Sequence, residues 1–302
     1  MINLKRALVL SGGGCKGAFE IGALRYLISQ QRLDFDLFCG TSVGAINAAF
    51  LSQAADSADL EKRVNTLAAQ WMSIKGWREI YRPNHFGVLS VLFGISLFKP
   101  LGLERLVHSL ITPQSLTTGK TLLIPAVALE DGELYFADSR KEADRFVMSR
   151  FVLASASIPL YFPPVLIRGK HWVDGGLRDL TPLSAILKEE PREVYIITTY
   201  PVSENLEPIF APFDRFNNSF AVTKRILDIL TAEIGSNDLK QIHKTNQNFP
   251  PRFRLGNTRT ILIAPEQPLS KGSMSFAPKL IRDYYQLGQT AAATPKVFSG
   301  PG

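Results

Sequence analysis

Two short stretches near the amino terminus decide the fold: residues 7–17, ALVLSGGGCKG, and residues 37–44, LFCGTSVG. Each is an apolar run followed by a glycine-rich turn and then by apolar residues at helical spacing, such as Ile21, Leu24 and Ile28 after the first turn. Strand, turn and helix repeated at this spacing are typical of a parallel α/β sheet. We therefore predict an α/β fold with a central, mostly parallel sheet.

The second stretch matches Gly-x-Ser-x-Gly, with Gly40 and Gly44 on either side of Ser42. In a nucleophile elbow of this pattern, the serine stands on a sharp turn between a strand and a helix, and small flanking residues allow that turn. A serine hydroxyl is a weak nucleophile until a neighbouring base accepts its proton. The same residues would also serve as a plain glycine-rich turn, but the strand before and the helix after favour a nucleophile.

The glycine loop of the first stretch has two interpretations. Its backbone N–H groups, at the start of a helix, suit a developing oxyanion. The spacing of Gly12, Gly14 and Gly17 also matches the Rossmann-type dinucleotide fingerprint, with Asp34 or Asp36 near the position of a ribose-binding acid. An oxyanion hole accounts for both stretches, whereas a dinucleotide site accounts for one. The expected oxyanion hole comprises Gly12, Gly13, Gly14, Cys15, Lys16 and Gly17.

The base that would activate the serine is open on sequence spacing alone. A Ser-His-Asp esterase of the α/β-hydrolase type needs a histidine late in the chain, and of the four histidines only His243 lies there. The better candidate is Asp174, which ends the second strand of a hairpin predicted around residues 168–170 and precedes Gly175 and Gly176. An Asp-Gly pair is also a common turn signal.

Composition limits the setting in which the protein works. The net charge of +7 and the pI near 9.4 favour an anionic partner such as a phospholipid surface or nucleic acid, and also serve simple solubility. Two cysteines do not make a disulfide scaffold. No segment resembles a signal peptide, and the longest uncharged apolar run is shorter than the about 20 residues of a transmembrane helix. We expect a cytoplasmic or peripheral membrane protein, with export by a non-classical route left open.

That apolar run, residues 86–98, has two interpretations of its own. It is rich in Phe, Leu and Val and contains two glycines, as a mobile flap that touches lipid near the active site would be. The candidate lipid contacts are then Leu92, Phe93 and Phe98. A buried core segment is the commoner fate of a run of this length.

Four motifs follow one another along the chain: GGGxxG at 12–17, GTSxG at 40–44, ASxxxP beginning at Ala154, and DGG at 174–176. In this order they resemble the signature of the patatin-like phospholipase family. The resemblance covers residues 5–292 and implies a three-layer α/β/α fold. The sequence shows no internal repeat and no clean linker, so we expect a single domain over residues 1–293 and a disordered tail at 294–302. Lys16 departs from the arginine usual in the glycine loop; it keeps the charge and loses the planar fork.

The resemblance implies a lipid acyl hydrolase of the phospholipase A or lysophospholipase type. Ser42 would be the nucleophile and Asp174 the general base of a Ser–Asp dyad, acting through an acyl-serine intermediate. It implies no metal and no organic cofactor. The expected partners are a phospholipid or other fatty-acyl ester and a transient membrane surface, without nucleic acid; whether a protein activator takes part is left open. A binding module with a degenerate site is the alternative that is not an enzyme.

Overall fold

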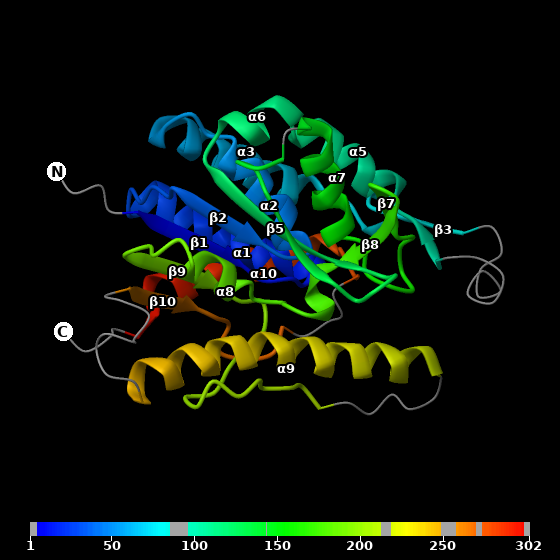
Figure 1. Ribbon diagram of the computed structural model, residues 1–302. Helices are drawn as coiled ribbons and strands as arrows, with labels where there is room; N and C mark the ends of the chain where they lie inside the picture. Colours follow the sequence, from blue (N-terminus) through cyan, green and yellow to red (C-terminus); the bar gives the residue numbers. More distant parts are fainter. Residues whose placement is uncertain are drawn as a thin grey trace.

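The computed structural model describes residues 5–84, 96–142, 144–212, 219–248, 258–269 and 274–298. Within them a mixed sheet forms the middle layer of the molecule, in the order β11-β10-β9-β1-β2-β5-β8-β7, with β6 also paired to β5 (Figure 1). The strands are β1 (Arg6–Leu10), β2 (Leu37–Gly40), β5 (Thr121–Ala128), β6 (Leu134–Asp138), β7 (Val165–Ile167), β8 (Lys170–Asp174), β9 (Glu193–Ile197), β10 (Arg259–Ile263) and β11 (Lys296–Phe298), with β3 (Arg82–Pro83) and β4 (Phe98–Lys99) in a separate pair.

The central strands β10, β9, β1, β2 and β5 run parallel, as the sequence predicts. Parallel neighbours end at the same edge of the sheet, so the turns after β1 and β2 lie side by side. The hairpin β7–β8 is antiparallel, and β8 pairs antiparallel with β5, with Asp174 opposite Ala126. This pairing brings the carboxyl end of β8 to the edge where the two glycine-rich turns lie.

Alternate residues of β1 point into two separate apolar cores. Leu8 and Leu10 belong to one core, and Ala7 and Val9 belong to the other. A parallel sheet covered on both faces needs such unbroken apolar strands. The three-layer α/β/α arrangement is therefore confirmed.

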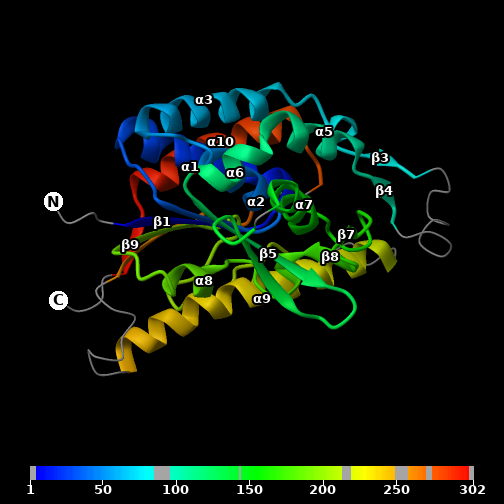
Figure 2. The ribbon, with the colours of Figure 1, turned by 45° about the horizontal axis from the view of Figure 1, so that its top comes forward.

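Helices cover both faces of the sheet (Figures 1 and 2). One face carries α1, α2, α3, α5, α6, α7 and α10, and the other carries α8 and α9. Within the described residues, no helix combines the length and the apolar composition that crossing a bilayer requires. The helices are α1 (Gly17–Arg25), α2 (Val43–Ser52), α3 (Ser57–Ser73), α5 (Leu101–Leu110), α6 (Pro113–Thr118), α7 (Arg145–Ser155), α8 (Leu183–Leu187), α9 (Ser219–Asn248) and α10 (Pro278–Ala293).

Part of the tail that was expected to be disordered, at 294–302, forms strand β11. Strand β11 pairs antiparallel with β10, with Val297 opposite Ile261. Three residues are too few to show the alternation of apolar and polar side chains that marks a strand, so the sequence did not predict β11.

Candidate active site

Ser42 stands on the turn between β2 and α2 in a backbone conformation that few residues adopt. Its φ is 57° and its ψ is −124°, which is a strained combination for a side chain other than glycine. The backbone N–H of Ser42 donates a hydrogen bond of 3.2 Å to Oγ of Ser155, at the end of α7. A Cβ atom on Gly44 would stand 2.5 Å from the carbonyl oxygen of Ser11, and one on Gly40 would stand 2.2 Å from that of Gly44. This is the strand–turn–helix geometry that the sequence predicts.

Asp174, the last residue of β8, lies against Ser42. Its carboxylate accepts a hydrogen bond of 2.8 Å from the backbone N–H of Gly176, and the Ser42 side chain is close enough to lower its pKa. Both side chains are buried, each with 5% of its surface exposed. A Cβ atom on Gly175 would stand 2.5 Å from the carbonyl oxygen of Pro125, so only glycine lets the chain turn this close to β5 after Asp174. The structure thus brings together the two residues that the sequence places far apart.

Burial raises the pKa of Asp174 from 3.8 to about 7, because desolvation of the carboxylate outweighs the contacts with Gly176 and Ser42 that stabilise its charge. A group with a pKa near the working pH is populated in both of its protonation states. It can therefore accept a proton and return it within one reaction cycle.

The glycine loop lies beside Ser42 and is held there by β9. Residues 12–14 line a cavity that also contains Ser42 and Asp174. A Cβ atom on Gly12 would stand 2.9 Å from the Cβ of Ser42. The carbonyl of Gly12 accepts a hydrogen bond from Oγ1 of Thr199, and the N–H of Thr199 donates to Oγ of Ser11 at 2.9 Å. Sequence reasoning missed Thr199, whose only signal is its place just after a β-branched strand.

The rest of the predicted oxyanion loop is divided between the cavity and the core. Lys16 lines the cavity. Cys15 is fully buried, and burial raises the pKa of its thiol. Gly17 begins α1, where a Cβ atom would stand 2.7 Å from Cγ2 of Val43. Gly17 therefore serves close packing between α1 and α2.

The dinucleotide interpretation lacks its acidic residue. A ribose-binding acid would have to lie at the end of β2 that is nearest the glycine loop. Asp36 instead precedes Leu37 at the opposite end of the strand and accepts a 3.0 Å hydrogen bond from the backbone N–H of Arg6. Asp34 is bound by Lys120. Neither carboxylate can reach a ligand on the glycine loop.

The structure describes only part of the remaining predicted site residues. Leu92 and Phe93 lie outside the described residues, so their role as lipid contacts stays a prediction. The side chain of His243, on α9, is also outside the described part of the chain. Phe98, in β4, is half-buried, and its ring stacks on that of Tyr161 with 5.9 Å between centroids. At position 98 the contact is packing against a buried ring; residues 86–95 of the run lie outside the described residues.

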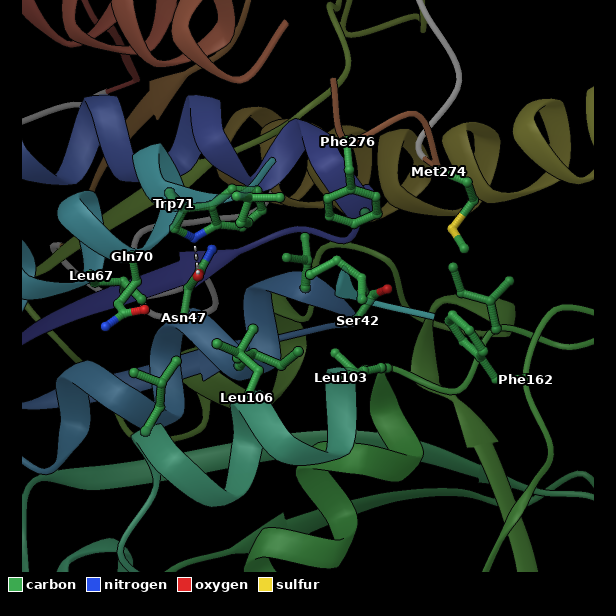
Figure 3. A pocket seen from close by; sticks show the side chains of 18 residues that line it. Ser42, Asn47, Leu67, Gln70, Trp71, Leu103, Leu106, Phe162, Met274 and Phe276 are labelled. Carbon is green, nitrogen blue, oxygen red and sulfur yellow. Dashed lines mark hydrogen bonds between the residues drawn. The ribbon is translucent and has the colours of Figure 1, made fainter. Parts of the chain in front are cut away.

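Two cavities meet at Ser42. The first is apolar and encloses about 670 Å³, its mouth included. In Figure 3 it extends from Ser42 and Phe162 toward Leu67 and Gln70, between α2, α3 and α5. Its walls include Val43, Ile46, Leu103, Leu106 and Phe276.

The second cavity is more polar and encloses about 880 Å³, its mouth included. Asp174, the glycine loop and Lys16 form one wall, and Asp228 and Thr231 of α9 form another. The long helix α9 is thus part of the site, although sequence periodicity shows only that a helix is present there. Ser42 therefore lies between an apolar cavity and a more polar one, which are called the apolar and the polar cavity below.

The chain is similar to known proteins along most of its length. A family model described as patatin-like phospholipase matches residues 8–187. The uncharacterized protein YjjU of Escherichia coli is 25% identical over 289 residues, which cover 94% of this chain and 74% of YjjU. Lysophospholipase NTE1 of Scheffersomyces stipitis is 21% identical over 306 residues, which cover 94% of this chain and 18% of NTE1.

Among solved structures, VipD from Legionella pneumophila aligns with a TM-score of 0.47 and 15% identity, over 98% of this chain and 68% of VipD. The family model spans more than half of the chain and includes both Ser42 and Asp174. The chain therefore belongs to the patatin-like phospholipase family.

Proposed function

We propose that this protein hydrolyses fatty-acyl esters of lipids, with Ser42 as the nucleophile and Asp174 as the general base. The observation that carries the proposal is the buried pairing of Ser42 with Asp174, whose pKa the serine side chain lowers, at the junction of an apolar cavity and a more polar one. An ester of a fatty acid and a polar alcohol has the same two-sided character. The reaction would be of the phospholipase A or lysophospholipase type.

In the first half-reaction, Oγ of Ser42 attacks the carbonyl carbon of the ester while its proton passes to the Asp174 carboxylate. The carbonyl oxygen gains the negative charge, and the backbone N–H groups of the loop at 13–15 are the candidate donors to it, at the amino-terminal end of α1. The tetrahedral intermediate then expels the alcohol oxygen, which takes the proton back from Asp174. An acyl group remains on Ser42.

In the second half-reaction, Asp174 removes a proton from water as the water oxygen attacks the acyl-serine carbonyl. The bond from Oγ to the acyl carbon breaks, Ser42 recovers its proton, and the fatty acid leaves. Asp174 ends each cycle as it began, as a carboxylate. Every proton is carried by these two side chains, the alcohol and water.

The cavities suggest how the substrate lies. We assign the acyl chain to the apolar cavity, because each buried methylene contributes about 0.8 kcal/mol to binding. We assign the alcohol, with its headgroup, to the polar cavity, where Lys16 supplies a positive charge beside the glycine loop. Such lipids are presented at a membrane surface, and the net charge of +7 favours an anionic one. We accordingly expect a cytoplasmic or peripheral enzyme.

The test is hydrolysis of p-nitrophenyl butyrate together with labelling by a fluorophosphonate, which forms a covalent bond with an activated serine. We expect the native protein to be labelled at Ser42 and to release fatty acid from phospholipid vesicles. Ser42→Ala should abolish both activities, and Asp174→Asn should reduce hydrolysis by about 10³-fold or more, as loss of a base that acts with its nucleophile does. Ser52→Ala, which removes a buried hydroxyl bonded within α2, is the control.

A second base would show itself in the same experiment. If Asp174→Asn keeps most of the hydrolysis while His243→Ala loses it, a Ser-His-Asp arrangement replaces the proposed dyad. If the native protein neither reacts with the probe nor hydrolyses any ester, the site is a binding site and the proposal fails.

A further inference from the structure

The nucleophile and the glycine loop are each followed directly by a helix, and a buried hydrogen bond joins the two helices. Glu20 lies in α1, which begins after the loop, and Asn47 lies in α2, which begins after Ser42. Nδ2 of Asn47 donates to Oε2 of Glu20 at 2.8 Å. The indole N–H of Trp71, in α3, donates to Oδ1 of Asn47 at 3.2 Å (Figure 3).

We infer that Glu20 and Asn47 are positioning residues, which fix the glycine loop relative to Ser42 so that oxyanion donors and nucleophile act on one carbonyl group. This inference rests on the proposed function. The bond lies about one turn inside each helix, next to the contact between Gly17 and Val43 at their first turns. Two contacts between a pair of rigid helices fix their relative rotation as well as their separation, which one contact does not.

The network is costly for the fold, which argues against a purely stabilising role. Glu20 is fully buried, Asn47 is 1% exposed and Trp71 is 7% exposed. Among the described residues, Oε1 of Glu20 has no hydrogen-bond partner. A buried polar group left unsatisfied destabilises the fold, because it loses its hydrogen bonds to water without gaining others. Apolar side chains of similar size at both positions 20 and 47 would avoid that cost, so the stability of the fold gives no reason for this buried polar pair.

The protonation state of Glu20 suggests a matched pair of variants. Burial raises the pKa of Glu20 well above its usual value, more than the hydrogen bond from Asn47 lowers it. Burial therefore favours the neutral form of this side chain. Glutamine has the same shape and charge as the protonated carboxyl and keeps an oxygen acceptor for Asn47. Methionine has a similar length without an acceptor of comparable strength, so Glu20→Gln and Glu20→Met differ in the hydrogen bond to Asn47.

The first experiment compares steady-state hydrolysis of p-nitrophenyl butyrate by these two variants and the native protein. For Glu20→Met we expect kcat to fall about tenfold or more while KM stays within about threefold of the native value. Misplaced reacting groups weaken contacts to the transition state but leave binding of the substrate unchanged. For Glu20→Gln we expect kcat within about threefold of the native value. A folded Glu20→Met with native kcat, or a Glu20→Gln as impaired as Glu20→Met, overturns the inference. Ser52→Ala again serves as the control on α2.

A second measurement does not depend on activity. Hydrogen exchange followed by mass spectrometry should show faster exchange at residues 12–17 and 42–46 in Glu20→Met than in the native protein, with the rest of the chain unchanged. Unchanged exchange in those segments overturns the inference. If the native protein proves to lack esterase activity, the proposed function fails while the exchange data still decide whether Glu20 fixes the two segments. Should Glu20→Met not fold, Trp71→Phe removes the donor to Asn47 together with part of the wall of the apolar cavity, and native kcat and exchange in that variant overturn the inference.

Discussion

Gly12 and Ser42 approach so closely that a Cβ atom on residue 12 would stand 2.9 Å from the Cβ of Ser42 and 2.7 Å from Cδ1 of Leu180. Residue 12 is held from behind as well, since its carbonyl accepts the hydroxyl of Thr199. The glycine loop therefore cannot retreat from the nucleophile without breaking a buried hydrogen bond. The absence of a side chain at position 12 sets the separation between the loop and Ser42.

We expect Gly12→Ala to lower kcat/KM for p-nitrophenyl butyrate by about 100-fold or more, because the methyl group forces apart the loop and the serine. Circular dichroism and thermal unfolding should show a folded protein. Gly132→Ala, at a hairpin turn where a Cβ atom meets nothing within 4 Å, is the matched control and should keep native activity despite its positive φ of 72°. Native activity in Gly12→Ala would mean that the loop does not contribute to the reaction.

The pKa of Asp174 predicts the pH dependence of hydrolysis. Only the carboxylate form can accept the proton of Ser42, and burial raises the pKa of this group to about 7. We therefore expect kcat/KM to fall about tenfold per pH unit below pH 7 and to reach a plateau above it. Rates between pH 5 and 9 with a soluble ester, whose solubility does not vary with pH, measure the midpoint. A midpoint near 4 would contradict a buried, desolvated base.

The same shift predicts that Asp174 destabilises the folded protein at neutral and alkaline pH. Its folded pKa, about 7, lies above the reference value of 3.8, so the folded chain binds more protons than the unfolded chain between these pH values. The free energy of unfolding then falls as pH rises through this window, by at most about 4 kcal/mol. Asp174→Asn removes the effect: we expect the variant to be as stable as the native protein near pH 4 and more stable at pH 8, by urea denaturation.

Asp138 serves as a control, because its pKa is shifted in the opposite direction to that of Asp174. Burial alone would raise the pKa of Asp138. The hydrogen bonds and the charge of Arg140 lower this pKa by more than burial raises it, so it lies below the reference value. Its carboxylate therefore stabilises the fold above the unfolded pKa, and that contribution is lost as pH falls through the lowered pKa. Asp138→Asn should be less stable than the native protein at pH 8, with a difference that shrinks toward pH 3. If both variants shift stability in the same direction at pH 8, the opposite pKa shifts are wrong.

The sequence predicts those parts of the site that are formed by short local motifs. The turns around Ser42 and Asp174 are visible because each follows a strand and has glycines beside it. Their meeting depends on the antiparallel pairing of β8 with β5, which no local pattern specifies. Family resemblance supplied that link, and the buried contact between Ser42 and Asp174 agrees with it.

The parts that sequence misses depend on packing between distant segments. The two cavities and the wall formed by α9 leave no periodic signal, because they arise from the spaces between elements. Glu20 and Asn47 did leave a trace, as single polar residues in the apolar runs AFEIGAL at 18–24 and GAINAAF at 44–50. A polar residue inside such a run is a candidate for a buried hydrogen bond, since an unpaired one would be expensive.

The assignment of the two cavities predicts that equal substitutions in each will have different effects. Leu106 is half-buried in the wall of the apolar cavity, and Leu227 is half-buried in the wall of the polar one. Leu106→Trp should shorten the space for an acyl chain. Because each excluded methylene forfeits about 0.8 kcal/mol, we expect the ratio of kcat/KM for palmitoyl over butyryl p-nitrophenyl esters to fall about tenfold or more once two methylenes are displaced. Leu227→Trp should leave that ratio unchanged and slow the release of palmitate from a phospholipid relative to p-nitrophenyl palmitate, because it narrows the space for the headgroup. The opposite pattern would exchange the assignments of the two cavities, and identical effects of both variants would show that neither cavity holds one end of the substrate.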